Sequence, residues 1–240
     1  MVERLTTGIP GLDEKMEGGF VKGSVNLVVG KTGTGKTQFC CSFIYAGAQL
    51  GEPGVYATTE ERAADIKEDV RAMFGWDFDL LEQQGLVKFV TLKPLFPEKP
   101  IESDIARITK NYILDIYQSL YNAVIEIGAK RLVLDSISVL EMFIHDKYLA
   151  RVAIMNLMER LRELNVTTVM TGEIPETGEG LSGSGIIEYL ADSVIKLDFV
   201  PVAEEFKRTI TIRKMRRTNH STLIYPFEIT PSGWRIIEVE

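Results

Sequence analysis

The 240-residue sequence predicts an α/β fold, with a mostly parallel central sheet flanked by helices and antiparallel strands at its C-terminal edge. Two observations support this class. Between Val25 and Ser193, short apolar runs alternate with longer segments of helical periodicity, which is typical of a parallel sheet covered on both faces. After Arg208, strand-like segments follow one another without helices between them, which indicates antiparallel strands.

The first half of the chain supplies apolar strands separated by segments in which apolar residues recur at helical spacing. Strands are predicted at Val25–Val29, Val55–Thr58 and Leu86–Leu92. Helices are predicted at Gln38–Leu50 and Glu60–Phe74. A proline-rich turn then follows at Lys93–Pro100.

The second half repeats the alternation and then changes to consecutive strands. Helices are predicted at Ile101–Ile127 and Lys147–Asn165, with strands at Arg131–Asp135 and Val166–Thr171. A mobile loop rich in glycine and serine is predicted at Glu173–Gly185, and strands resume near Ser193. The final strands are predicted at Arg208–Met215, Thr222–Ile229 and Trp234–Val239. Because no internal repeat or linker interrupts the pattern, we expect a single domain over residues 1–240.

Composition and charge narrow the class of protein. A formal net charge of −7 argues against a globally basic nucleic-acid binder, because phosphate neutralisation needs concentrated lysine and arginine. No stretch approaches the roughly 18 uninterrupted apolar residues that a membrane span needs. We therefore expect a cytoplasmic protein without a membrane partner. The neighbouring Cys40 and Cys41 lie on a predicted helix, and we interpret them as buried thiols rather than a disulfide or a metal site.

The strongest functional motif follows the first apolar strand and precedes a helix. It fits the phosphate-binding pattern G-x-x-x-x-G-K-[ST] with residues Gly30, Lys31, Thr32, Gly33, Thr34, Gly35, Lys36 and Thr37. In such a loop, backbone N–H groups and a helix N-terminus surround phosphate oxygens. Lys36 then meets the β- and γ-phosphates, and the Thr37 hydroxyl meets Mg²⁺. The motif predicts binding of ATP or ADP with Mg²⁺.

A second motif supplies an acid at the end of a buried strand. The run Leu132–Leu134 is apolar and is followed directly by Asp135. In proteins with a phosphate-binding loop, such an acid orients the Mg²⁺ shell, here partly through water. We therefore predict that Asp135 and Thr37 together form the metal site.

Hydrolysis also requires a group that positions or deprotonates water, and Glu60 and Glu61 follow the strand Val55–Thr58. We expect this strand to neighbour the phosphate-loop strand, which would bring the carboxylates to the ligand crevice. The alternative is that both acids only favour the N-terminus of the next helix, where the helix dipole stabilises negative charge. Sequence spacing alone does not separate these two interpretations.

These residues resemble the KaiC-like branch of the RecA superfamily, of the archaeal KaiC and RadA type, over nearly the whole chain. The similar segments are Thr6–Asp13 with Gly18-Gly19, Val55–Glu61, Phe74–Trp76, Thr168–Glu173, and Lys214–His220 followed by Tyr225–Phe227. The resemblance implies a single RecA-like P-loop ATPase domain. It also implies a homo-oligomer, because proteins of this type complete their sites at the subunit boundaries of a hexameric ring.

The resemblance assigns further roles to individual residues. Glu60 becomes the catalytic base with Glu61 beside it, and Lys36 remains both a binding and a catalytic group. Lys214 and Arg216 reach the γ-phosphate of the neighbouring subunit. Asn219 and His220 contact the sugar side of that nucleotide. Without the resemblance, the basic run around Lys214 is equally typical of a solvated edge strand or a nucleic-acid patch.

The sequence also departs from this family. Arg217 stands where the family usually has glycine, which predicts an altered hairpin turn near Asn219. Glu188 and Tyr189 stand where the clock protein carries its phosphorylated Ser-Thr pair, so autokinase activity is not implied. The clock protein has two such domains in tandem, and this chain has the length of one. Clock function is therefore not implied.

The leading hypothesis is an oligomeric Mg²⁺-dependent ATPase whose hydrolysis drives regulatory signalling to an unidentified protein partner. One alternative is a RadA-paralogue-like recombination accessory protein that binds single-stranded DNA through the basic run Arg213–Arg217. Another is a nucleotide-binding scaffold with slow turnover, in which ATP joins the subunits. The sequence favours the ATPase over both alternatives.

Overall fold

A nine-stranded sheet organises the computed structural model, which describes residues 2–92, 105–144, 146–175, 180, 185–202 and 204–237. The strand order is β11-β10-β9-β8-β3-β7-β6-β4-β5. All pairings from β8 to β5 are parallel, and the pairings that join β8, β9, β10 and β11 are antiparallel. The predicted α/β class, with antiparallel strands at the C-terminal edge, is confirmed.

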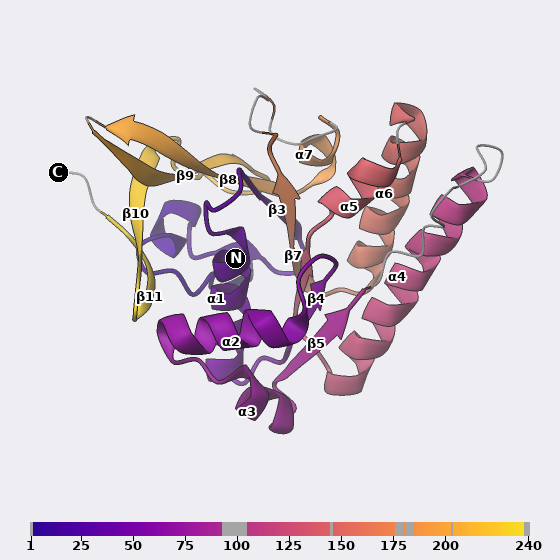
Figure 1. Cartoon of the computed structure of the whole chain (residues 1–240), viewed down its shortest axis with the longest axis horizontal. Coiled ribbons are helices and arrows are strands. Elements are labelled where there is room, and N and C mark those ends of the chain that lie inside the picture. The colour runs from indigo at the N-terminus through magenta and orange to yellow at the C-terminus, as the bar shows by residue number, and fades with distance from the viewer. Residues whose placement is uncertain are drawn as a thin grey trace.

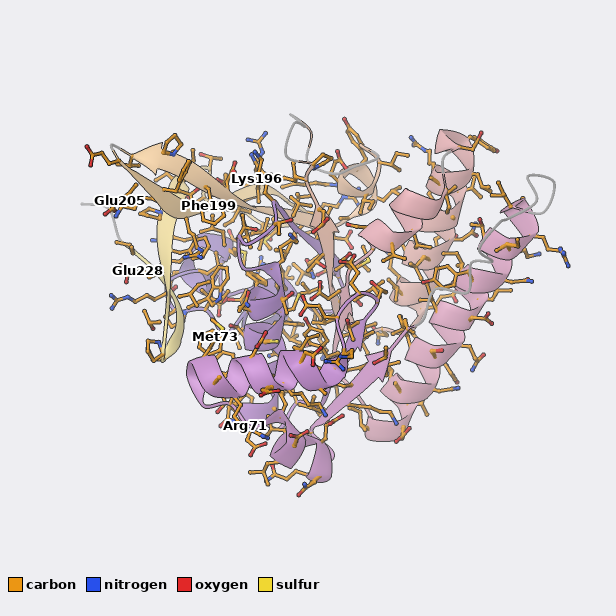
Figure 2. The ribbon with its side chains drawn as sticks, viewed as in Figure 1. Arg71, Met73, Lys196, Phe199, Glu205 and Glu228 are labelled. Atoms are coloured by element: carbon orange, nitrogen blue, oxygen red, sulfur yellow. The ribbon has the colours of Figure 1, made fainter. Side chains whose placement is uncertain are left out.

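The strands of the large sheet differ in burial, since the central ones are buried and several of the outer ones are partly exposed. They are β3 (Val25–Gly30), β4 (Gly54–Thr58), β5 (Val87–Thr91), β6 (Arg131–Asp135), β7 (Thr167–Glu173), β8 (Ser193–Val202), β9 (Glu205–Met215), β10 (Ile224–Thr230) and β11 (Gly233–Ile236). A separate two-stranded sheet pairs β1 (Arg4–Leu5) with β2 (Phe20–Val21). The hairpin of β8 and β9 leaves the body of the molecule, and Figure 2 shows Phe199 and Glu205 on this projecting part.

Helices cover both faces of the sheet. They are α1 (Lys36–Gln49), α2 (Ala63–Phe74), α3 (Phe78–Gln83), α4 (Ile105–Ile127), α5 (Ser138–Phe143), α6 (Lys147–Glu163) and α7 (Ile187–Leu190), with a 3₁₀ helix, η1, at Asp13–Met16. Figure 1 shows α4 and α6 side by side, away from α1 and α2. Strand residues alternate between two buried clusters: Leu132 packs with α4 and α6, whereas Val133 packs with α1 and α2. This alternation explains why the central strands are apolar throughout.

One expectation about strand order is wrong. The strand β4 does not neighbour the phosphate-loop strand β3, because β7 and β6 lie between them. Helix α1 packs across all four of these strands as it connects β3 to β4. The later strands β6 and β7 fill the intervening positions, and hydrophobic periodicity contains no information about this insertion.

The second helix also begins later than predicted. Glu60 and Glu61 lie before α2, whose first residue is Ala63. The Thr58 hydroxyl donates to the carbonyl oxygen of Glu61 at 2.8 Å, and Arg62 is extended with ψ of 136°. The two acids therefore occupy a turn between β4 and α2, so the predicted start of this helix at Glu60 is wrong.

Some predicted segments lie outside the described residues. These are the turn Lys93–Pro100, the first residues of the helix predicted at Ile101–Ile127, and most of the loop predicted at Glu173–Gly185. Among the described residues, no helix combines the length and apolarity needed to cross a membrane. Cys40 and Cys41 are buried free thiols on α1, as predicted.

Candidate nucleotide-binding site

A cleft of about 240 Å³ lies at the carboxyl ends of the parallel strands. Residues of the phosphate-binding loop form one wall, and the ends of β4, β6 and β7 form the rest together with α2. The lining residues are Thr32, Gly33, Gly35, Lys36, Thr37, Gln38, Thr58, Glu60, Glu61, Ile66, Asp69, Val70, Asp135, Ser136 and Glu173. The carboxyl edge of a parallel sheet is where ligands bind in open α/β folds.

The loop between β3 and α1 presents backbone donors to this cleft. Gly35 is the N-cap residue of α1, and no side chain caps the helix there. The first N–H groups of α1 are thus available to an anion, and the first turn contains no acidic residue that would compete. Gly35 adopts φ of 104°, and a Cβ atom there would lie 2.7 Å from Trp234. This position therefore needs glycine for both its backbone conformation and its close packing.

Lys36 provides the cation of the cleft. Its Nζ donates to the carbonyl oxygens of Gly30 at 2.9 Å and Lys31 at 3.1 Å. It also lies 3.8 Å from a carboxylate oxygen of Glu173, at the end of β7. The Thr34 hydroxyl closes the loop by donating to Lys31 O at 2.7 Å. The ammonium group is thus held over the loop, where a phosphate would lie.

Thr37 and Asp135 meet at the base of the cleft. The Thr37 hydroxyl donates to Asp135 Oδ2 at 2.9 Å, and the same oxygen accepts a hydrogen bond from Tyr56 at 2.7 Å. Thr171, on β7, donates to the other carboxylate oxygen at 2.5 Å. The carboxylate of Asp135 is therefore held by hydroxyl groups from three different elements.

The oxygen atoms at this position fit a hard cation. Thr37 and Asp135 supply a hydroxyl and a carboxylate, which are ligands suited to Mg²⁺. Within the described residues, no group of three or more His, Cys, Asp or Glu side chains could hold a metal ion by itself. Mg²⁺ commonly binds through one or two protein oxygens, substrate phosphates and water, and the arrangement fits that mode.

The glutamates lie beside Asp135 because β4 pairs with β6. Thr58 and Asp135 are register partners, so the turn after Thr58 passes the end of β6. The Ser136 hydroxyl donates to Glu60 Oε1 at 2.6 Å. Burial raises the pKa of Glu61, and the negative charges of Asp135 and Asp69 raise it further. Although β4 does not neighbour β3 as expected, Glu60 and Glu61 still line the cleft. The reason is that β4 pairs with β6, and Asp135 at the end of β6 also lines the cleft.

The structure places Lys214 and Arg216 away from this cleft in the same chain. Lys214 Nζ donates to three carbonyl oxygens around α7, those of Glu188 at 3.0 Å, Tyr189 at 3.1 Å and Ala191 at 2.6 Å. Burial lowers the pKa of Lys214, and the charge of Arg216 lowers it further. Neither residue belongs to the cleft lining.

The segment after β9 rests on the N-terminal part of the chain. The backbone N–H of Asn219 donates to Glu17 Oε1 at 3.2 Å, and Nδ1 of His220 lies 2.8 Å from the carbonyl oxygen of Ser221. Neither Asn219 nor His220 lines the cleft. Arg217 adopts φ of 57°, a left-handed conformation that favours glycine. Arg217 therefore holds a backbone conformation that is costly for a side chain and that would suit the glycine expected at this position.

The prediction omitted some residues of the cleft. Asp69 projects from α2, Ser136 follows Asp135, and Glu173 ends β7. The position of Ser136 directly after a strand-ending acid was a usable signal. The sequence around Asp69 contained no such signal, because acidic residues are common on the polar face of an amphipathic helix.

Comparison with known proteins identifies relatives along nearly the whole chain. The family model described as ATPase: KaiC matches residues 5–240. A UPF0273 protein from Thermotoga maritima is 36% identical over 97% of this chain and 95% of its own length. The circadian clock protein KaiC3 from Synechocystis is 36% identical over 95% of this chain and 44% of its own length. A solved KaiC-like protein from Pyrococcus horikoshii has a TM-score of 0.83 and 41% identity, covering 99% of this chain and 100% of that one.

The similarity extends well beyond the phosphate-binding loop. The match begins at residue 5, before the loop, and continues through the antiparallel strands at the C-terminal edge. Both the fold and the sequence are shared with the solved relative. Family membership supports ATP binding, for which the cleft beside Lys36 has the expected form. This chain belongs to the KaiC family of ATPases.

Proposed function

We propose that this protein binds and hydrolyses ATP with Mg²⁺ at sites shared between neighbouring copies in a homo-oligomeric ring. The observation that supports this proposal most directly is the composition of the cleft. Lys36, Asp135 and Glu60 lie together in one chain, whereas Lys214 and Arg216 lie elsewhere on the same chain. In this proposal, a further cation at the γ-phosphate, in addition to Lys36, comes from another copy.

In this proposal the phosphate-binding loop positions the nucleotide. The N–H groups at the start of α1 and the ammonium group of Lys36 bind the β- and γ-phosphates. Thr37 would hold Mg²⁺ directly, and Asp135 would hold it partly through water. Bound Mg²⁺ would offset the negative charge of the transferring phosphoryl group.

Glu60 is the proposed general base. Its Oε1 atom accepts a hydrogen bond from Ser136, which leaves Oε2 to accept the proton of the attacking water. The water oxygen forms the new bond to the γ-phosphorus, the bond to the β–γ bridging oxygen breaks, and ADP leaves with inorganic phosphate. Glu61 lies in the same cleft, where burial raises its pKa and its negative neighbours raise it further. We assign it an electrostatic role beside the base.

The neighbouring subunit supplies the remaining groups. Lys214 and Arg216 stabilise the charge that develops on the γ-phosphate, and Asn219 and His220 contact the sugar side of the nucleotide. Lys214 must exchange its three carbonyl partners for the phosphate to do this. A head-to-tail ring would repeat this contact between Lys214, Arg216 and the nucleotide at each interface. We propose that the ring is hexameric, as the resemblance to KaiC-like proteins implies. We propose a cytoplasmic, regulatory role exerted through a protein partner.

The alternative of single-stranded DNA binding receives less support. In the run Arg213–Arg217, Arg216 Nη1 lies 3.1 Å from Asp192, and Lys214 is occupied by carbonyl oxygens. The ion pair with Asp192 offsets part of the positive charge of the run, and the whole chain has a formal net charge of −7, which disfavours binding to phosphates.

Phosphate release measured with and without Mg²⁺ tests the proposed activity. Wild-type protein should hydrolyse ATP only with Mg²⁺, and Lys36→Ala should abolish nucleotide binding measured by calorimetry, because the cation at the β- and γ-phosphates is lost. Lys207→Ala is a matched control, since Lys207 is an exposed residue paired with Glu205. Nucleotide affinity of Lys36→Ala within about twofold of wild type would refute the site. Tight binding without turnover would instead support the scaffold alternative.

A further inference from the structure

The carboxylate of Asp135 is held from both neighbouring strands. Its strand β6 lies between β4 and β7 in the sheet. Tyr56 on β4 donates to Oδ2 at 2.7 Å, and Thr171 on β7 donates to Oδ1 at 2.5 Å. Thr37 on α1 donates to Oδ2 as well. A side chain held at both oxygens has little freedom to rotate.

The register of the sheet explains how Tyr56 reaches this carboxylate. Tyr56 pairs with Val133, two residues before Asp135, so all three project from the same face of the sheet. That face is the one covered by α1, which contains Thr37. An aromatic side chain is long enough to span the diagonal between neighbouring strands.

The position of the Tyr56 hydroxyl is itself fixed. The side chain is fully buried, and its ring stacks on Phe89 with centroids 5.0 Å apart and planes 16° apart. A phenylalanine would make the same ring contacts, so packing alone does not account for the hydroxyl. A buried hydroxyl is costly without a partner, and Asp135 is a partner at hydrogen-bonding distance.

We infer that Tyr56 is a positioning residue for the metal site, which acts by fixing the orientation of the Asp135 carboxylate beside Thr37. The inference rests on the proposed function, in which these two residues hold Mg²⁺. It predicts a selective effect. Without the hydroxyl, the nucleotide would still bind to the phosphate-binding loop, but the additional affinity that Mg²⁺ contributes would fall.

Calorimetric titration with a non-hydrolysable ATP analogue tests this inference, in Mg²⁺ and separately in EDTA. We expect Tyr56→Phe to weaken binding about tenfold in Mg²⁺, as is typical when a partner of a metal ligand is removed, and by less than about twofold in EDTA. Tyr45→Phe is a matched control, since Tyr45 also stacks in the same layer, on Trp76 at 4.4 Å, and does not touch Asp135 in the described contacts. Tyr45→Phe should leave the affinity for the analogue unchanged both in Mg²⁺ and in EDTA.

Thr171→Val provides a second variant that removes the donor to the other oxygen, and it should shift the Mg²⁺-dependent affinity in the same direction. Thermal melting of each variant verifies folding. The inference is overturned if wild-type binding depends on Mg²⁺ and Tyr56→Phe preserves that dependence. It is also overturned if Tyr56→Phe weakens binding equally in Mg²⁺ and EDTA, which indicates a packing role. If wild-type affinity itself does not depend on Mg²⁺, the proposed magnesium site fails instead.

Discussion

Thr37 and Asp135 are separated by 98 positions in the sequence, and their side chains are joined by a hydrogen bond of 2.9 Å. This contact connects the first turn of α1 to the end of β6. It brings the phosphate-binding loop and the strand-ending acid into one cleft, beside Glu60. The chemistry proposed for this protein depends on that junction.

Glu60→Gln should preserve binding of ATP and Mg²⁺ while slowing turnover by roughly 10²-fold or more, because the glutamine cannot accept the proton of the attacking water. Single-turnover phosphate release measures the rate, and calorimetry measures the affinity. Glu61→Gln is the matched variant in the same turn and should have the smaller effect. A larger loss for Glu61→Gln than for Glu60→Gln would assign the base to Glu61.

Glu61 should make stability depend on pH. Because burial and nearby carboxylates raise its pKa in the folded state, the folded protein binds more protons than the unfolded chain between the ordinary and the raised pKa. The favourable contribution is therefore present at low pH and is lost as the pH rises through the raised pKa. Glu61→Gln should increase the melting temperature relative to wild type at pH 7 more than at pH 4. An equal difference at both pH values would contradict this assignment.

Arg217→Gly should stabilise the fold. A side chain in the left-handed region costs roughly 1–2 kcal/mol, whereas glycine adopts it freely but loses more entropy on folding. We expect a net gain of about 0.5–1 kcal/mol in the free energy of unfolding, measured by urea denaturation. Arg213→Gly, within β9, is the control and should destabilise the protein. A loss of stability in Arg217→Gly would show that contacts of the arginine side chain outweigh the backbone cost.

Local patterns were sufficient for part of the fold and site. The phosphate-binding loop occupies contiguous residues between a strand and a helix, and the acid Asp135 ends an apolar run, so both could be located by inspection. The order of the strands in the sheet could not be predicted in this way, because α1 crosses the two positions that the later strands β7 and β6 occupy. The role of Tyr56 was hidden for a different reason. An aromatic residue in an apolar strand predicts packing, and its partner Asp135 is 79 positions away.

The short elements were also missed for a physical reason. Helices α3, α5 and α7 have four to six residues, too few to establish a helical period. No sequence pattern predicted the contacts between Lys214 and the carbonyl oxygens around α7, because these contacts depend on how β9 pairs with β8. Exact side-chain partners require the tertiary structure.

The proposal of a shared site makes a specific demand on mixed oligomers. Protomers with Lys36→Ala retain Lys214 and Arg216. Protomers with Lys214→Ala and Arg216→Ala retain an intact phosphate-binding loop. Each variant alone should be inactive. Because Lys214 also contacts carbonyls of its own chain, circular dichroism must show that the second variant is folded. Exchange of subunits is verified separately with labelled protomers.

ATP turnover of the two variants mixed at varied ratios tests the central claim most directly. A head-to-tail ring creates junctions at which an intact phosphate-binding loop meets Lys214 and Arg216 of the neighbouring protomer. The mixture should therefore regain measurable hydrolysis that neither variant shows alone. With subunit exchange demonstrated, absence of any recovered activity across all mixing ratios would contradict the assignment of Lys214 and Arg216 to the neighbour's nucleotide.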